Sequence, residues 1–127
     1  MPVESDAELR EILGMTRIAV VGCSSTPGKE AHEIPKYLLD NGYEVIPVNP
    51  TADEILGQRA YDSLSEVEET VDIVDVFRPS DEVPGIVDEA LNRDDVAVVW
   101  TQLGIADEEA AARAEDAGLR VVQDKCL

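Results

Sequence analysis

The sequence predicts a single α/β domain built on a five-stranded parallel sheet. Three observations support this fold class: apolar runs of strand length recur along the chain, helical patterns separate most of them, and 127 residues suffice for one core. Connections of this length require neighbouring strands to run parallel. Continuous apolar runs fit strands covered on both faces, so we expect one domain over 1–127 with helices on both sides of its sheet.

The N-terminal part of the chain predicts two helices and two strands. Segment 5–14 opens with a capping-box pattern and closes on a glycine, which is typical of a short amphipathic helix. The runs RIAVVG (17–22) and YEVIPVNP (43–50) predict the first and second strands. Between them, IPKYLLDNG (34–42) predicts a helix with Pro35 in its first turn, where a proline leaves no hydrogen bond unmade.

The remaining chain continues the alternation. Segment 51–69 has the composition of a loop with short helical turns around Gly57. Three further apolar runs predict strands, two amphipathic segments between them predict helices, and Ser80 or Asp81 is expected to cap the first of these helices. In chain order, these five elements are expected at 70–79, 80–95, 96–104, 105–118 and 119–127.

The order of the strands follows from connection rules. Right-handed crossovers leave few arrangements of five parallel strands, and we choose the order 3-2-1-4-5, a doubly wound, Rossmann-like sheet. Ligands of such sheets bind beyond the carboxyl ends of the strands, where the strand order reverses. We therefore expect a crevice between the first and fourth strands, lined by the loops after Val21, Val48, Phe77 and Trp100.

Composition and charge exclude several classes of function. The 28 Asp and Glu outnumber the 10 Lys and Arg, and a net charge of −18 leaves too few cations for a nucleic-acid partner. No apolar run reaches the roughly 20 residues of a membrane helix, and the acidic N-terminus lacks a signal peptide. We expect a cytoplasmic protein with no membrane partner. Because its acids are spread over the polar faces of the helices, we interpret the acidic surface as halophilic, suited to a salty cytoplasm.

The loop after the first strand has the chemistry of a phosphate site. Gly22 ends the strand, Ser24, Ser25 and Thr26 offer hydroxyl donors, and Lys29 adds positive charge where the next helix begins. Free amides and the positive end of the helix dipole favour an anion there. The alternative left open is that the hydroxyls only cap the helix and Lys29 is a solvated surface charge.

The same loop differs from two common phosphate-binding loops. It lacks the second glycine of the G-x-G-x-x-G pattern, and the second strand ends in PVNP (47–50) without the acid that holds the ribose of NAD. It also lacks the G-K-[ST] ending of a Walker A loop. The missing glycine and the missing acid argue against NAD as the ligand, and the third departure rules out a Walker A loop.

Five segments, in order and without large gaps, carry a resemblance to a known family. They are VVGCSSTPGKEAHEIPKYLLDNGYEVIPVNP (20–50), ILGQRAYDSL (55–64), VDIVDVFRPSDEVPGIVDEAL (71–91), VVWTQLGI (98–105) and EDAGLRVVQDKC (115–126). On these residues the chain resembles the small stand-alone CoA-binding proteins related to the CoA-binding domain of succinyl-CoA synthetase. The resemblance implies a Rossmann-like fold and coenzyme A as the ligand.

The resemblance also implies roles for residues of this chain. The first loop would grip the diphosphate of CoA, 48–50 would lie near adenine and ribose, and 77–79 would face the crevice. The pantetheine arm would pass Gln102 and Gly104, and Trp100 would either line its path or belong to the core. The residues expected to contact CoA are Gly22, Cys23, Ser24, Ser25, Pro27, Lys29, His32, Val48, Asn49, Pro50, Phe77, Arg78, Gln102 and Gly104.

Two residues depart from the pattern of the family, and one has an open alternative. Lys29 stands where the family usually has an arginine, so it keeps the charge but not the bidentate geometry. Ala31 stands where the family often has a serine. Arg78 either meets a phosphate of the ligand or pairs with Asp81 or Glu82 on the surface.

Candidates for catalysis are few. His32 is the only histidine, and we expect it near the charged end of the ligand rather than in a chemical role. Cys23 and Cys126 are too few for a disulfide framework and lack zinc spacing; a mixed disulfide of Cys126 with CoA, favoured by Lys125, is the alternative to two inert thiols. No nucleophile and base can be combined, so we expect no catalytic residue and no metal.

We therefore expect a non-catalytic module that binds CoA or an acyl-CoA. If it assembles, we expect a complex with a partner protein or a homo-oligomer. Two alternatives stay open: a nucleotide- or NAD-dependent enzyme that uses the same crevice, and a detached subunit of an acyl-CoA ligase. Stabilisation by NAD but not by CoA would favour the first alternative. Co-purification with a nucleotide-binding partner would favour the second.

Overall fold

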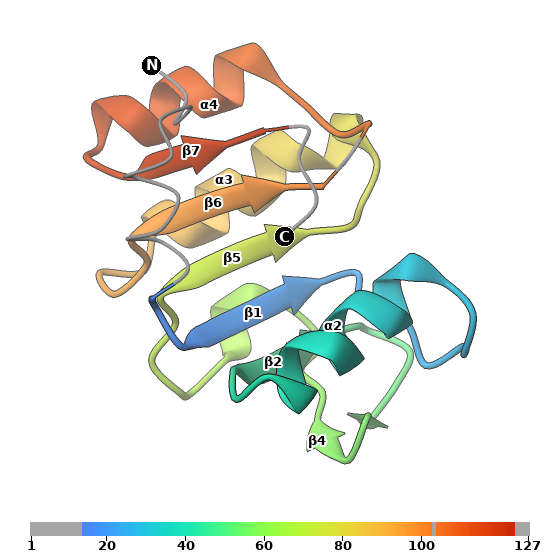
Figure 1. Ribbon diagram of the computed structural model, residues 1–127. Helices are drawn as coiled ribbons and strands as arrows, with labels where there is room; N and C mark the ends of the chain where they lie inside the picture. The colour runs from blue at the N-terminus through green and yellow to red at the C-terminus, as the bar shows by residue number, and fades with distance from the viewer. Residues whose placement is uncertain (1–13, 103, 124–127) are drawn as a thin grey trace.

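The computed structural model describes residues 14–102 and 104–123. They form an α/β domain with one five-stranded parallel sheet, as predicted (Figure 1). Its strands are β1 (Arg17–Val21), β2 (Glu44–Val48), β5 (Ile73–Val76), β6 (Val98–Thr101) and β7 (Arg120–Val122). All five lie within the predicted runs and are shorter than them at one or both ends, since the pairing stops before the loops. The predicted helix at 5–14 lies outside the described residues, apart from its last residue.

The strand order is β2-β1-β5-β6-β7, so the predicted order 3-2-1-4-5 is wrong. The third strand of the sheet, β5, pairs with β1, and β2 is at the edge. Pro47 in β2 explains why this order is favourable. Its carbonyl accepts from Tyr61 at 3.0 Å on the side away from β1, so the nitrogen without a hydrogen also faces outward. An inner strand would have lost a ladder hydrogen bond at that position.

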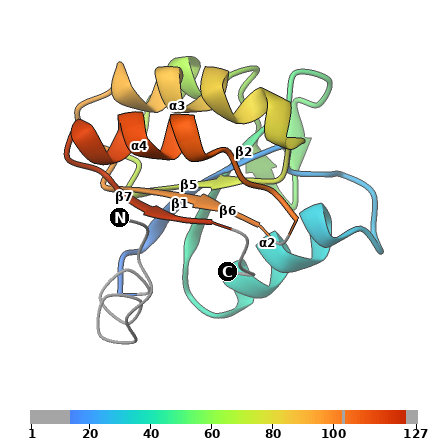
Figure 2. The same ribbon diagram turned by 90° about the horizontal axis from the view of Figure 1, so that it is seen from above.

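Helices cover both faces of the sheet, as predicted (Figure 2). Helix α2 (Glu30–Asp40) lies on one face, and α3 (Val83–Leu91) and α4 (Glu108–Asp116) lie on the other. The β1 side chains alternate between the two resulting cores: Ile18 and Val20 belong to the cluster of the α2 face. The α3–α4 cluster contains Ala19 and Val21. In the described part of the chain, no helix is both long and apolar enough to cross a membrane.

Two helix starts differ from the predictions. Helix α2 begins at Glu30, four residues before the predicted start, so Pro35 lies in its second turn rather than its first. The third strand is followed by a 3-10 turn, η2 (Ser80–Glu82), and neither Ser80 nor Asp81 caps α3 with its side chain. The Ser80 hydroxyl instead accepts from the amide of Ala106 at 3.0 Å, which ties this turn to the loop before α4.

The connection from β2 to β5 contains a small hairpin that the sequence did not predict. Strands β3 (Glu54–Ile55) and β4 (Gln58–Arg59) pair antiparallel around Leu56 and Gly57, which both have positive φ. That backbone is typical of a type I′ hairpin turn, in place of the helical turns expected around Gly57. A 3-10 helix, η1 (Leu64–Glu66), follows the hairpin, so one short helical turn does occur in this segment.

Arg93 holds the end of this connection against the body of the domain. Its guanidinium donates to the carbonyls of Leu64, Val67 and Glu69 at 2.8–3.0 Å and pairs with Asp95. Four partners around one half-buried cation stabilise a defined backbone path for residues that line the cavity.

Candidate functional site

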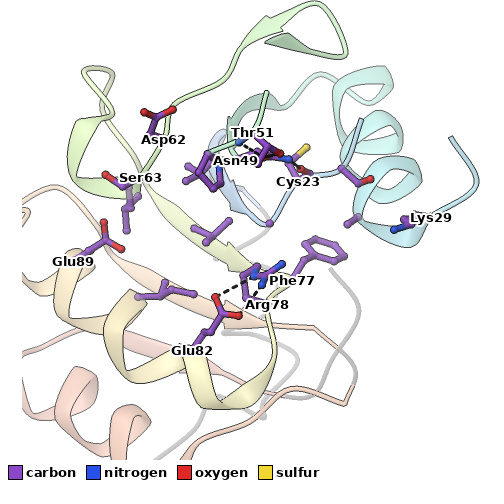
Figure 3. Close-up of a pocket in the computed structure, with 18 residues that line it drawn as sticks. Cys23, Lys29, Asn49, Thr51, Asp62, Ser63, Phe77, Arg78, Glu82 and Glu89 are labelled. Carbon is purple, nitrogen blue, oxygen red and sulfur yellow. Dashed lines mark hydrogen bonds and ion pairs between the residues drawn. The ribbon is translucent and has the colours of Figure 1, made fainter. Parts of the chain in front are cut away.

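A cavity of about 680 Å³ opens at the carboxyl ends of β1, β2 and β5 (Figure 3). Its size is typical of small-molecule sites. The chain leaves β1 toward β2 on one side and reaches β5 on the other, so the strand order reverses here. The crevice therefore lies between the first and third strands of the sheet, and the expected position between the first and fourth is wrong because the strand order differs.

Nine of the fourteen expected contact residues line the cavity. They are Gly22, Cys23, Ser24, Lys29, Val48, Asn49, Pro50, Phe77 and Arg78. Five do not: Ser25 and Pro27 are exposed on the outside of the loop, His32 is turned to Glu33, and Gln102 and Gly104 follow β6 away from the cavity. The lining residues that the sequence did not single out include Thr51, Asp62, Ser63, Leu64, Ile86 and Glu89. Glu82, expected only as a surface partner of Arg78, also lines the cavity.

Gly22 allows the two walls of the cavity to touch. Its φ is +90°, and a Cβ at this position would lie 2.8 Å from Cδ of Arg78 and 3.3 Å from the backbone of Phe77. The aliphatic stem of Arg78 thus packs directly on the backbone that starts the first loop. Only glycine combines this conformation with this close approach.

Pro35 helps to hold the first loop over α2. A proline has no N–H, so the carbonyl of Ala31, four residues earlier, has no partner from position 35 inside the helix. That carbonyl accepts instead from the amide of Ser24 at 2.8 Å. The break that proline makes in the helix ladder is therefore filled by the loop, and the loop is anchored from behind.

Asn49 anchors the same loop from the side of β2. Its amide nitrogen donates to the carbonyl of Cys23 at 2.9 Å, and its oxygen accepts from both the amide and the hydroxyl of Thr51 at 2.8 Å. Both polar atoms of the side chain are used inside the protein. Asn49 lines the cavity, but its geometry makes it a positioning residue for the loop.

Polar groups at the start of α2 face the cavity without a side-chain cap. Lys29 is the N-cap residue and makes no capping bond, and the Ser24 hydroxyl accepts from Thr26 rather than from the helix. The alternative in which these hydroxyls cap α2 is therefore wrong. Among the described residues, the amides of Glu30 and Ala31 have no protein acceptor. Together with the Lys29 charge they favour an anion at this wall.

The opposite wall is acidic. Arg78 donates from Nε and Nη2 to the Glu82 carboxylate at 3.1 and 2.7 Å, so one of the two pairs considered for Arg78 is formed. These hydrogen bonds lower the pKa of Glu82. Glu89 accepts from the amide and hydroxyl of Ser65, and Asp62 lies beyond it on the connection after β4. Figure 3 shows these acids across the cavity from Lys29.

A buried carboxyl lies in β5, one of the three strands whose carboxyl ends meet the cavity. Asp75 in β5 is fully buried, accepts from Nε2 of Gln102, and has one oxygen without a partner among the described residues. Burial raises its pKa to about 7, and the Gln102 hydrogen bond opposes this rise. Burial, and then the charge of Asp75, raise the pKa of the Cys23 thiol to about 12. Cys23 is thus a protonated, unreactive thiol at neutral pH.

The other candidates for chemistry are separated. His32 is half-buried, and its Nδ1 lies 3.2 Å from the Glu33 carboxylate and outside the cavity. Trp100 is 3% exposed and belongs to the core of the α2 face. No group of three or more possible metal ligands occurs in 14–102 and 104–123. The expectations for Cys126 and Lys125 lie outside the described residues.

A parallel sheet with a cavity where its strand order reverses, and with helix amides on one wall, defines a Rossmann-like ligand-binding domain. The family model described as a CoA binding domain matches residues 16–127. The chain belongs to this family, as the resemblance implied.

Relatives of the chain fall into two groups by size. The uncharacterized protein YneT of Bacillus subtilis is 46% identical over 97% of this chain and 91% of its own length. A hypothetical protein from Pyrococcus horikoshii has the same fold with a TM-score of 0.92 and 36% identity, over 99% of this chain and 90% of that one. The ADP-forming acetate–CoA ligase of Methanocaldococcus jannaschii is 36% identical over 66% of this chain but only 12% of the ligase. The chain is therefore a CoA-binding domain related to acyl-CoA ligases.

Proposed function

We propose that the protein binds coenzyme A or an acyl-CoA in the cavity as a binding module without chemistry of its own. The observation that carries the proposal is the wall formed by Gly22, Lys29 and the first amides of α2, in a chain of the CoA-binding family. Unpaired amides at a helix start and a lysine match the diphosphate of CoA.

The two walls suggest how the ligand is oriented. The diphosphate lies against the first loop, and the adenosine extends along the end of β2, past Val48 and Pro50. At the far end, Asp62 and Ser63 offer hydrogen-bond acceptors to the amino and hydroxyl groups of a nucleoside.

The described side chains support binding rather than catalysis. The Cys23 thiol is held protonated by burial, and His32 has a carboxylate neighbour but no nucleophile. Neither residue has the arrangement of nucleophile, base and orienting group that covalent or acid–base chemistry needs.

A second function is favoured by the ligase relatives. The chain would then be one part of a multi-chain acyl-CoA ligase whose partner supplies the nucleotide site. Purification of the tagged chain from its own cells, followed by mass spectrometry, distinguishes the two functions. A stoichiometric nucleotide-binding partner would support the ligase part, and its absence together with CoA binding by the isolated chain would support the module.

Calorimetric titration at high salt tests the proposed function, with CoA, acetyl-CoA, NAD and ATP as ligands. We expect CoA or acetyl-CoA to bind and NAD to bind less tightly, because no acid holds the ribose at the end of β2. Lys29→Glu should weaken CoA binding by about 1–3 kcal/mol. Lys36→Glu makes the same charge change on the exposed side of α2, outside the cavity, and is the control. Equal losses in both variants, or tighter binding of NAD, would contradict the proposal.

A further inference from the structure

Arg78 and Glu82 form an ion pair inside the cavity itself. Both side chains line it, and Figure 3 shows their two hydrogen bonds on the acidic wall. The two hydrogen bonds occupy the Nε and Nη2 donors of the guanidinium, which a ligand could otherwise use. The cation expected to meet a phosphate is therefore occupied by a carboxylate of the protein.

The stem of Arg78 determines where its charge can go. Cγ and Cδ pack on Gly22, at 3.2 and 2.8 Å from the position of a Cβ there. Gly22 begins the loop that holds the diphosphate in the proposed function. Rotation about the Cγ–Cδ and Cδ–Nε bonds moves the guanidinium away from Glu82 while Cγ and Cδ stay packed on Gly22. Arg78 thus has two partners within reach, one permanent and one that arrives with the ligand.

The balance between the two partners is close. The side chains of Arg78 and Glu82 are 48% and 44% exposed, and exposed ion pairs contribute little free energy. A diphosphate carries more charge than one carboxylate and accepts the guanidinium in the same bidentate geometry. Once Arg78 has turned, Glu82 is left facing an anion across the cavity, which opposes binding.

We propose that Glu82 sets the affinity of this site by competing with the bound diphosphate for Arg78. The inference rests on the proposed function and adds a residue that controls it. In the free protein Glu82 holds Arg78; in the complex Arg78 is bound to the ligand and Glu82 is unpaired. Removing the Glu82 charge should therefore tighten binding, whereas removing Arg78 should weaken it.

Calorimetric titration with CoA tests this in four variants. Glu82→Gln should bind CoA about two- to fivefold more tightly than the unmodified chain, the range expected when an exposed ion pair no longer competes. Arg78→Gln should bind about tenfold more weakly. In the Arg78→Gln background, adding Glu82→Gln should produce less tightening than it does alone, because the competition has been removed. Glu89→Gln is the matched control: it removes the same charge from the same cavity, from a residue that bonds Ser65 and not Arg78.

The outcomes separate the inference from the proposed function. If CoA binds to the unmodified chain but Glu82→Gln leaves the affinity unchanged, the inference is overturned and the proposed function stands. Equal tightening by Glu82→Gln and Glu89→Gln would also overturn it, since general repulsion would then explain the effect. If the unmodified chain binds no CoA species at all, the proposed function and the inference fail together.

Discussion

The junction from β1 to α2 and the junction from β5 to α3 face each other across the cavity. The first is long, spans residues 22–29, and is anchored from behind through Ser24 and Asn49. The second is shorter and spans 77–82, and its charged side chain Arg78 is paired with Glu82 in the 3-10 turn of the same junction. The first junction therefore leads into the free amides of Glu30 and Ala31, and the second presents a cation that is already paired.

This difference shows two ways to prepare a wall for an anion. Free backbone amides that lie next to a loop fixed by other hydrogen bonds need no rearrangement when a ligand arrives. They therefore act as preorganised donors. A side-chain cation held by a carboxylate must exchange partners, so its contribution depends on the competitor. Substitutions in each junction test whether the stability and the ligand affinity that depend on the other junction also change.

The largest expected effect is the pH dependence caused by Asp75, two residues before the second junction begins. Its pKa rises from 3.8 to about 7 on folding, so the folded state holds a proton that the unfolded state has lost between these values. This contribution to the free energy of unfolding is greatest below pH 4 and declines up to pH 7, by roughly 2–4 kcal/mol.

Asp75→Asn removes this titration. Urea unfolding at high salt should show that the variant gains stability relative to the unmodified chain as the pH rises from 4 to 7, with little relative change above 7.5. The other carboxylates contribute to both curves and cancel in the difference. Parallel curves over this range would show that Asp75 titrates equally in both states.

A second prediction concerns the contact between the junctions at Gly22. Gly22→Ala should lower the free energy of unfolding by roughly 2–3 kcal/mol, because it adds a Cβ against Arg78 to the strain of a positive φ. Gly28→Ala is the control: its φ is +94°, and nothing lies within 4 Å of the added Cβ. The control should lose only about 1 kcal/mol.

The difference between these two glycine variants measures the contact alone. Thermal unfolding monitored by circular dichroism provides it directly. Gly22→Ala should also weaken CoA binding more than Gly28→Ala does, since Arg78 is displaced. Equal losses of stability would mean that Arg78 moves aside without consequence, and the two walls would then be independent.

Much of the fold could be predicted because the strands of the sheet are buried on both faces. Runs such as RIAVV (17–21) carry that signal in their own residues, whatever lies elsewhere in the chain. The strand order could not be predicted in the same way, since the handedness rules allow several orders. A signal was nevertheless present in Pro47, which favours an edge strand. The hairpin was missed because Leu56 takes a positive φ that its residue type does not predict.

The two walls of the site also differ in how much of each could be predicted from the sequence. The first loop could be predicted because glycine, hydroxyls and Lys29 stand together in sequence after a strand. The acidic wall could not: Asp62, Glu82 and Glu89 are three of 28 acids, and only the fold shows which of them face the cavity. The hydrogen bonds of Gln102 and Asn49 could not be predicted for a related reason, since their partners are distant in sequence.

The smallest expected effect tests the anchor of the first junction. Pro35→Ala restores an N–H that can donate to the Ala31 carbonyl, in competition with the Ser24 amide at 2.8 Å. The helix itself should gain stability, because proline in a helix interior is unfavourable. The loop should lose about 0.5–1.5 kcal/mol of anchoring, the net value of one hydrogen bond.

Hydrogen exchange and titration together separate these opposing changes. The Ser24 amide should exchange faster in Pro35→Ala, and CoA affinity should fall by a few-fold, while the temperature of unfolding stays level or rises. Lys36→Ala, on the exposed side of the same helix, should change neither the exchange nor the affinity. Unchanged protection of the Ser24 amide would mean that the Ala31 carbonyl accepts from both amides. The first junction would then be held mainly by Asn49.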